Sequence, residues 1–567
     1  MTANGDGEDL SAAEAQRYIE RLQQLVNAAK AADAADAEPR SPRGPRTLDT
    51  GSADPSSPGH RWWQYRRMNV KSSNGNGNGN GAHVAPSPPE PERAAPDSAS
   101  DGGPPGSSPA AADASVNIFP TNTRSGVGYF IVGALLLVVV VVASQLGGTS
   151  QGVVLVPVAG VLLAVAAGRR IVRRHPDEPW MTSWLVLGTL AKIAACYAHY
   201  YNITVTYGGV ADATTYDGYG RQFAHAWLHG GLAPVLPNLR ETNFVNWFTG
   251  VVYYVFGANL ITGTFVYGLL ALIGSYFWYR ATVDAVPIVN KKLYLAFVLF
   301  APSIVFWPAL ISKEALMQLG LGVIALGAAS LLRQQFIKGL VIALPGCWLV
   351  WVVRPHLLAL VALSVGFAYF AGHVRKRGKK KNGILSRPVG IIIIALLVAF
   401  TVGQAASFLG LSSISASGIQ SELDKQTARS DTGGSHFNNG GNSLNPIYLP
   451  RDAVTVLIRP FPWEAGGGVQ LLAALEGAAI GALLILRLRS LRISLARSRE
   501  MPFLMFCWVL TGLYAVAFAS FANFGLLVRE RSLVLPAVFA LVAVDPVLAR
   551  RRAAVEPEYA DAAARAG

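Results

Sequence analysis

Charged side chains are scarce in this sequence: they make up 14% of its 567 residues, against 51% hydrophobic residues. A soluble globular domain has about 25% charged residues, and the mean hydropathy here is +0.34. This composition excludes an ordinary soluble enzyme and predicts a membrane protein. Cysteine is also scarce, since only Cys196, Cys347 and Cys507 occur. All three fall in apolar segments, where small buried thiols are expected, so we expect neither a disulfide framework nor a cysteine metal site.

The first residues, MTANGDGEDL, lack the basic and apolar segments of a cleaved signal peptide. From Glu38 to Ser115 the chain is rich in Pro, Gly, Ser, Asp and Asn, with too few apolar residues to form a core. We therefore expect residues 1–120 to form a disordered cytoplasmic tail, with a short amphipathic helix near 10–35 that is a candidate for binding a cytoplasmic partner. The basic and aromatic segment His60–Lys71 either suits an anionic membrane surface or is a chance cluster.

Apolar segments of membrane-spanning length recur through residues 121–553. A hydrocarbon core of roughly 30 Å needs about 20 apolar residues per helix, which predicts an all-α bundle of about twelve transmembrane helices. Lys and Arg gather in alternate connections, which the positive-inside tendency places in the cytoplasm. These connections also explain the net charge of +14, so we expect no nucleic-acid partner. Both termini, including a short tail at 554–567, are then cytoplasmic in a multi-pass protein of the plasma membrane.

The predicted spans share length and low charge, and Phe244–Gly257 is predicted to be interfacial because it is short and aromatic. The spans are Gly126–Gln145, Gly152–Gly168, Trp180–Tyr201, Asn259–Val283, Leu293–Ile311, Ala315–Leu332, Leu340–Val353, Leu357–Gly372, Val389–Leu409, Gly466–Leu486, Pro502–Phe521 and Leu533–Leu548.

The remaining connections form the predicted extracytoplasmic face, with larger loops at about 202–258 and 410–465. They hold isolated cations, which short outer loops usually avoid. Guanidinium groups bind phosphate oxygens through paired hydrogen bonds, so the cations indicate an anion site. Alternatively, each Arg either snorkels to the membrane surface or pairs with a nearby carboxylate such as Glu464 or Glu530. The candidate substrate-binding or phosphate-binding residues are Lys313, Glu314, Arg354, His356, Arg459, Glu464, Arg529 and Arg531.

The outer segment Gly208–Gly220, GGVADATTYDGYG, is acidic. A deprotonated Asp can take a proton from a sugar hydroxyl as that hydroxyl attacks an activated anomeric carbon. Asp212 and Asp217 are the candidate catalytic bases, and on a loop that leads into a helix both can face one cleft. Asp212 is preferred, with Asp217 as the alternative. Two solvated loop acids give the same pattern.

Two further pairs of polar residues stand out. His225 and His229 lie four residues apart in FAHAWLHGG, a predicted interfacial helix, so they share a face. With Asp217 they form a weak candidate for a divalent metal site, but the main prediction includes no metal and no other cofactor. Lys192 and Glu476 are predicted inside spans, where ionisable groups are costly. We expect them to form a structural pair or, alternatively, to mark the ion path of a transporter.

The order of three segments resembles a known family. GGVADATTYDGYG is followed by NWFTGVVYYVFGAN and then by APSIVFWPALISKEAL. This layout, within Trp180–Leu332, resembles that of polytopic GT-C type glycosyltransferases, such as the dolichyl-phosphate-mannose protein mannosyltransferases and the lipopolysaccharide-core glycosyltransferases. The resemblance implies a polyprenyl-phosphate sugar donor and gives Asp212 the position of the catalytic base.

The C-terminal half looks like bacterial O-antigen polymerases and ligases. The similarity lies in Arg354-Pro355-His356, in the long outer loop, in RPFPWE (Arg459–Glu464), and in the Arg-x10-Gly spacing of Arg429 and Gly440. Both resemblances imply transfer of a sugar or glycan from a polyprenyl phosphate or pyrophosphate to an acceptor hydroxyl, in cell-envelope glycan synthesis. The implied partners are a polyprenyl-linked donor, a glycan or protein acceptor, and membrane lipids. A lipid-linked glycan flippase or other transporter, which favours mid-membrane polar residues and two similar halves, and a membrane scaffold are the alternatives.

Overall fold

The computed structural model describes residues 152–375, 395, 398–399, 403, 415–430, 437 and 446–552. These residues belong to the compact unit 112–567. They are helical and contain no strand beyond one bridge between Val289 and Val544. The predictions for the tail 1–120, for Gly126–Gln145, for most of Val389–Leu409 and for 554–567 lie outside the described residues.

Seven helices in the described part are long and apolar enough to cross a membrane. They support a multi-pass, all-α membrane protein, whereas the count of about twelve spans stays a prediction. The seven are α3 (Gly152–Arg174), α4 (Met181–Tyr201) with its π-helical extension Asn202–Thr206, α7 (Leu260–Ala285), α10 (Lys313–Leu332), α11 (Phe336–Val353), α12 (Pro355–Arg375) and α16 (Gly468–Leu486).

One predicted span, Leu293–Ile311, is not a single continuous helix. The segment breaks into α8 (Lys291–Phe300) and α9 (Pro302–Phe306) and then leaves helical structure before Ser312. Ala301 between the two helices is extended, with φ −60° and ψ 126°. The residue before a proline is disfavoured in the helical region, so Pro302 ends α8 and begins α9.

A second predicted span, Leu533–Leu548, has the wrong bounds. The observed helix α19 runs from Phe524 to Val542, so Arg529, Glu530 and Arg531 lie within a helix and not in a loop. The side chain of Asn523 caps it by accepting a hydrogen bond from the backbone N–H of Leu526, as short polar residues do at helix starts. α18 (Pro502–Phe518), which precedes it, has only 17 residues.

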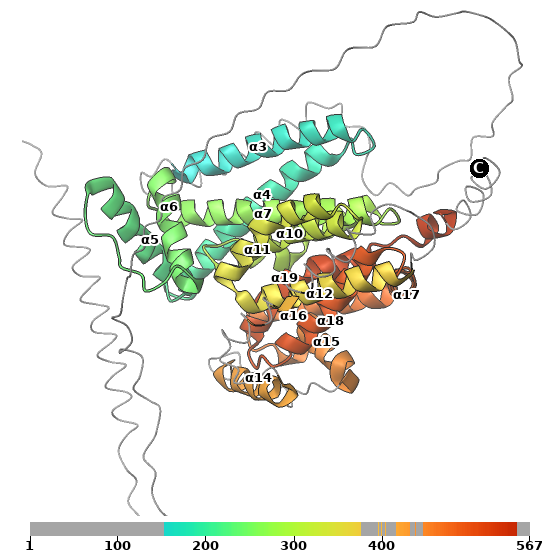
Figure 1. The fold of residues 1–567 in the computed structure, drawn as a ribbon. Helices are drawn as coiled ribbons and strands as arrows, with labels where there is room; N and C mark the ends of the chain where they lie inside the picture. Colours follow the sequence, from blue (N-terminus) through green and yellow to red (C-terminus); the bar gives the residue numbers. More distant parts are fainter. Residues whose placement is uncertain are drawn as a thin grey trace, which may run out of the picture. The chain divides into compact units, whose positions relative to one another are not determined.

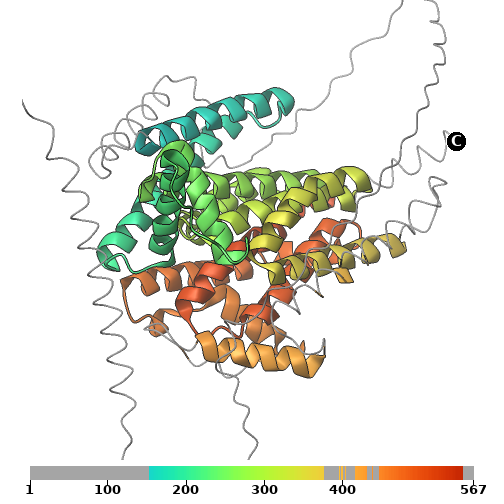
Figure 2. The same cartoon turned by 60° about the vertical axis from the view of Figure 1, so that its left-hand side comes forward.

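The starts of two other helices bring acidic residues to the same end of the bundle. Ser312 caps α10 through the N–H of Ala315, which places Glu314 in the first turn. α5 (Asp212–His229) begins at Asp212 after the extended residue Ala211. α5 and α6 (Glu241–Phe256) lie together beside the membrane-length helices, as Figures 1 and 2 show. α6 covers the predicted interfacial segment Phe244–Gly257; its place at an interface stays a prediction.

The centre of the bundle is the packing of α10 between α7 and α11 (Figure 1). Within α10, 83% of the span is buried, the largest share among the seven candidate spans. Glycines allow this close approach: a Cβ on Gly274 of α7 would lie 2.2 Å from the carbonyl oxygen of Gln318, and one on Gly322 would lie 2.2 Å from that of Gly274. Small residues at such contacts are typical of membrane helices, where backbones pack directly.

The remaining described elements lie within or after the predicted loop at 410–465. That region is not one irregular loop, because its described parts include α14 (Ala416–Ser430) and α15 (Leu449–Ile458). Two 3-10 turns, Pro446–Tyr448 and Pro462–Glu464, precede and follow α15, and α17 (Leu488–Ala496) comes directly after α16.

Candidate functional site

Charged residues from four parts of the chain meet at one end of the bundle in a row of alternating sign. Arg529 lies between two carboxylates: its Nη1 is 3.4 Å from Asp212 Oδ2, and its Nη2 is 2.9 Å from Glu314 Oε2. Arg354 continues the row, with its Nη2 2.5 Å from Glu314 Oε1 and its Nη1 paired with Glu530. We call Asp212, Arg529, Glu314, Arg354 and Glu530 the ion-pair row.

The ion-pair row runs from solvent into the bundle. The Asp212 side chain is 65% exposed, whereas that of Glu314 is fully buried. Buried charges are tolerated when each one has partners of opposite sign with good geometry. Burial alone would lower the pKa of Arg354, but the carboxylates of Glu530 and Glu314 raise it above its ordinary value. Arg354 therefore stays charged. Attraction between neighbouring side chains of opposite charge holds the row together.

Asp212 and Arg529 lie on the wall of a pocket of about 440 Å³. The pocket is formed by the end of α4, the loop before α5, the segment between α9 and α10, and the start of α19. Its other polar and aromatic lining residues, which the sequence did not single out, are His199, Asn202, Tyr207, Trp307, Ser312 and Asn523. Two sequence signals could have indicated these residues. One is a histidine and an asparagine at the end of an apolar span, and the other is a tryptophan after the helix break. Asp212 sits at the first position of α5, where the helix dipole favours a negative charge.

Asp217 has a different environment from Asp212, and of the two carboxylates only that of Asp212 lines the 440 Å³ pocket. Its Oδ2 accepts a hydrogen bond from Arg221 Nε at 2.8 Å, and its Oδ1 accepts one from the hydroxyl of Tyr253 on α6. Burial, together with the Asp217 carboxylate, raises the pKa of Tyr253 well above its ordinary value. Because Asp212 also lies in the helix, five residues place the two carboxylates about 140° apart around α5. Asp217 attaches α5 to α6.

Lys313 differs from the other predicted cations. It begins α10 next to Glu314, its side chain is partly buried, and no hydrogen bond or ion pair involves it within the described ranges. Its ammonium group is therefore available for a ligand. His356 follows Arg354 at the start of α12, with its ring 6.5 Å from that of Phe518.

Arg459 and Arg531 do not join the ion-pair row. Arg459 Nη2 lies 2.5 Å from Glu464 Oε1, and its guanidinium lies 4.1 Å from the centre of the Phe437 ring. Arg531 is fully buried and lies 3.1 Å from Glu476 Oε2. The cations that were predicted to form one anion site therefore lie in separate places. Each Arg among them pairs with a carboxylate, which agrees with the alternative that these arginines are paired within the protein.

The predicted direct pair of Lys192 and Glu476 is wrong as well. Lys192 Nζ donates to the carbonyl oxygens of Ile304 and Val305 at 2.9 and 2.8 Å, at the C-terminal end of α9. Glu476 Oε1 accepts from the N–H of Ser303 at 2.7 Å, at the N-terminal end. The two charges complement the dipole of this short helix. They fix the broken segment whose continuation, from Trp307 to Ser312, lines the pocket.

The other candidates are placed as follows. The rings of His225 and His229 lie 4.7 Å apart on one face of α5, as their spacing predicts. Across the residues that the structure describes, no group of three His, Cys, Asp or Glu side chains is arranged to hold a metal ion. The three cysteines are free thiols. Gly440 and the side chain of Arg429 lie outside the described residues.

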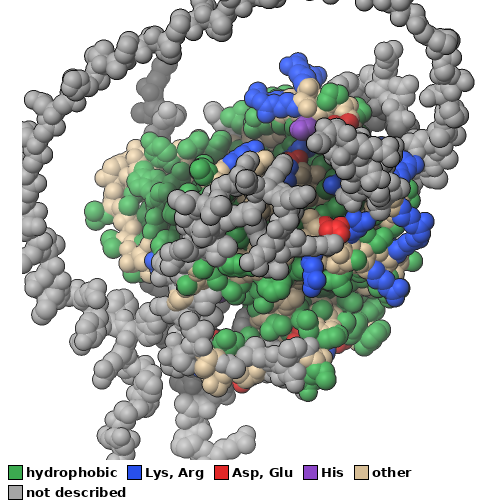
Figure 3. Space-filling view, turned by 45° about the vertical axis from the view of Figure 1, so that its right-hand side comes forward, with side chains coloured by type: hydrophobic (Ala, Val, Ile, Leu, Met, Phe, Trp, Pro, Cys, Tyr) green, Lys and Arg blue, Asp and Glu red, His purple; other side chains and the backbone are tan. Residues whose placement is uncertain are grey.

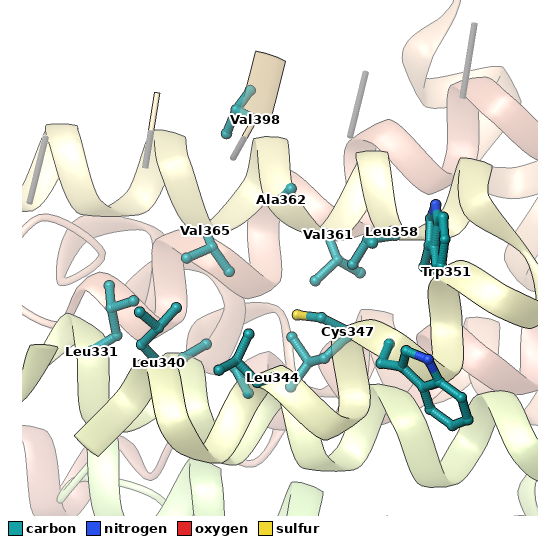
Figure 4. A pocket seen from close by; sticks show the side chains of 14 residues that line it. Leu331, Leu340, Leu344, Cys347, Trp351, Leu358, Val361, Ala362, Val365 and Val398 are labelled. Carbon is teal, nitrogen blue, oxygen red and sulfur yellow. The ribbon is translucent and has the colours of Figure 1, made fainter. Parts of the chain in front are cut away.

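A second pocket, of about 290 Å³, lies between α10, α11 and α12 and is entirely apolar in its lining. Figure 4 shows Leu340, Leu344 and Cys347 opposite Leu358, Val361 and Val365, with Trp351 at one end. Trp351 lies three residues before Arg354. The guanidinium of Arg240 stacks over its ring, 4.5 Å from the ring centre. The apolar pocket thus ends near the charged end of the bundle.

Comparison with known proteins found no matching family model, no matching curated protein and no matching solved structure.

Proposed function

We propose that the protein transfers a sugar or glycan from a polyprenyl phosphate or pyrophosphate to an acceptor hydroxyl at the extracytoplasmic face of the membrane. The observation that carries this proposal is the exposed carboxylate of Asp212 on the wall of the 440 Å³ pocket, where it pairs with Arg529, which Glu314 holds in turn. A positioned carboxylate of this kind can act as a general base.

The lining of the pocket supports a sugar ligand. The rings of Tyr207 and Trp307 offer flat apolar faces, and Asn202, Ser312 and Asn523 offer hydrogen-bonding groups. Ligand sites typically combine an apolar surface with a few polar groups that fix orientation. A sugar ring has hydroxyl groups at its edge and C–H groups on its faces, and this lining suits both.

In the proposed reaction the acceptor oxygen attacks the anomeric carbon, and the bond between that carbon and the phosphate oxygen breaks. Asp212 takes the proton of the acceptor hydroxyl, and the bonding electrons leave with the phosphate. Lys313 and Arg529 supply positive charge where negative charge develops, which is an effective contribution to lowering a barrier. Since Arg529 already contacts two carboxylates, Lys313 is the cation with free hydrogen-bonding capacity for that phosphate.

The buried members of the row have a positioning role in this proposal. Glu314 contacts both Arg529 and Arg354, so it fixes the guanidinium that in turn contacts Asp212. Groups held in place before the reaction need little rearrangement during it. The apolar pocket of Figure 4 provides a place for part of the polyprenyl chain, with Trp351 directing the chain towards the charged end.

Lipid-linked glycans from cells that lack the protein test the proposal. We expect lipid-linked donors to accumulate and the corresponding cell-surface glycan to be lost, with recovery by the wild-type gene and none by Asp212→Asn at equal protein level. Accumulation of single lipid-linked repeat units, with loss only of long polymers, identifies the polymerase form of the same chemistry. Unchanged lipid-linked and surface glycans contradict the proposal.

One observation favours transport as a second candidate function. The helix break at α8 and α9, with charged side chains at both ends of α9, resembles the discontinuous helices at transporter binding sites. A lipid-linked glycan flippase would show glycan movement across proteoliposome membranes without formation of a new glycosidic bond. Detection of the transferred product in detergent solution, where no compartment exists, excludes transport as the whole activity.

A further inference from the structure

Helix α17 turns its serines towards the protein. Ser490 and Ser494, together with Ser498 in the following turn, are buried against the rest of the bundle. Trp508 Nε1 on α18 donates a hydrogen bond to Ser494 Oγ at 3.1 Å. The hydroxyls of Ser494 and Ser498 donate to carbonyl oxygens one turn earlier, at 2.8 and 2.6 Å. The hydroxyls of Ser494 and Ser498 are therefore satisfied by the protein itself.

The opposite face of α17 mixes leucine with arginine. Leu488 and Leu495 are 45% and 57% exposed, and Arg489, Arg492 and Arg499 are exposed as well. At 100° per residue, Leu488, Leu495 and the two helical arginines fall within an arc of about 120°. Arg499 lies in the turn that follows α17. Arg492 and Arg499 make no hydrogen bond or ion pair with any residue that the structure describes. This face therefore presents exposed apolar and basic side chains together.

The other two arginines of this segment have protein partners. Arg487 donates to the carbonyl oxygens of Val542 and Val544 at 3.2 and 3.3 Å, which ties the start of α17 to the end of α19. Arg497 pairs with Glu500 at 2.7 Å. The paired arginines therefore provide matched controls for Arg492 and Arg499.

The leucine-bearing face begins where an exposed apolar helix ends. α16 is the candidate span with the smallest buried share, 17%, and its last residues Ile485 and Leu486 are 74% and 80% exposed. α17 follows after one residue. Figure 3 shows Lys and Arg side chains gathered at the edge of a largely hydrophobic surface on one face of the molecule.

We propose that α17 is an interfacial helix that binds anionic lipid headgroups. Leu488 and Leu495 enter the boundary of the acyl chains, and Arg489, Arg492 and Arg499 bind lipid phosphate oxygens. Long arginine side chains keep their charge at headgroup level while their stems lie along apolar surface. Amphipathic helices with Leu and Arg bind membranes through apolar burial and attraction to anionic lipid, and each basic residue adds about fivefold in affinity near such a surface. This surface is independent of the proposed reaction.

The experiment uses the full-length protein with Leu495→Cys in a Cys347→Ala background, labelled with an environment-sensitive fluorophore. The protein is placed in nanodiscs of phosphatidylcholine alone or mixed with phosphatidylglycerol, and quenching by acrylamide is measured. We expect severalfold weaker quenching in the anionic nanodiscs. Replacing Arg489, Arg492 and Arg499 together by Gln removes that difference, whereas Arg497→Gln keeps it. Equal Tm values in neutral nanodiscs show that the triple variant is folded.

Two results overturn the proposal. One is equal quenching in neutral and anionic nanodiscs for the wild-type side chains, because the arginine-bearing face then does not distinguish lipid charge. The other is a gain of quenching in both lipids when residues 1–120 are deleted, because an acidic part of the chain's own N-terminal region then covers α17 in place of lipid.

Discussion

Arg354 Nη2 lies 2.5 Å from Glu314 Oε1, although the two residues belong to the connection between α11 and α12 and to the first turn of α10. Glu314 is the only carboxylate in the ion-pair row that contacts two arginines, Arg354 and Arg529. A buried carboxylate with two guanidinium partners is the point at which the row is most sensitive to substitution.

The variant Glu314→Gln should be strongly destabilised. It leaves Arg354 and Arg529 each without one carboxylate in a buried setting, and breaking a buried ion pair in this way costs about 3–5 kcal/mol. The Tm of the purified protein in lipid nanodiscs measures the effect. Asp177→Asn is the matched control, since it removes the exposed pair with Lys291 and exposed pairs contribute little. Equal Tm losses for the two variants would show that the row is not a structural centre.

The glycine contact between α7 and α10 should tolerate no added carbon atom. A methyl group on Gly274 would lie 2.2 Å from a backbone oxygen, which cannot move without moving α10. We expect Gly274→Ala to lower stability by about 1–3 kcal/mol, the usual cost of overpacking. Gly512→Ala on α18 has no heavy atom within 4 Å of the new carbon, so it should be neutral or mildly stabilising. The same Tm measurement compares them, and a neutral Gly274→Ala would contradict the observed packing.

Stability should fall in alkaline solution because of Tyr216 on α5. Burial, with a smaller effect from the Asp212 carboxylate, raises the pKa of Tyr216 to about 12, from 10 in the unfolded chain. A phenol whose pKa is raised by folding contributes its full stability below pH 10 and loses it as the pH rises towards 12. The expected loss is about 1 kcal/mol at pH 11. Chemical unfolding at pH 8 and pH 11 measures it. Tyr216→Phe should reduce the loss, and the exposed Tyr219→Phe should not; equal losses in both variants would rule out this assignment.

Hydropathy predicted the bounds of the long apolar helices, which depend mainly on the composition of each segment. α4, α7, α10 and α16 begin and end within a few residues of the predicted spans, because about 20 apolar residues are sufficient for a span regardless of neighbours. The break before Pro302 was missed because the apolar run continues through it. α19 was predicted to start nine residues too late. The three charged residues Arg529, Glu530 and Arg531 indicate a loop by composition, and only the structure shows the partners that stabilise them inside a helix.

The sequence predicted most charged residues of the ion-pair row, but neither their pairing nor the other polar and aromatic residues that line the pocket. The alternation of basic loops correctly placed Asp212, Glu314 and Arg354 at one end of the bundle, although the side of the membrane on which that end lies stays a prediction. The partners depended on which helices are neighbours, and one sequence carries no such information. Asp217 shows the limit most clearly, because the angle that separates its carboxylate from that of Asp212 follows only from the start of α5 at Asp212.

The central claim is that Asp212, and not Asp217, takes the proton of the acceptor. The most direct measurement is the initial rate of transfer from a polyprenyl-phosphate-linked sugar by the purified wild-type protein, Asp212→Asn and Asp217→Asn, with the Tm of each variant as a check on folding. General-base catalysis contributes about 10²–10⁴-fold, so Asp212→Asn should lose at least about a hundredfold in kcat with its Tm unchanged, while Asp217→Asn loses stability and little kcat. A wild-type rate for Asp212→Asn, or a larger kcat loss for a folded Asp217→Asn, would contradict the account.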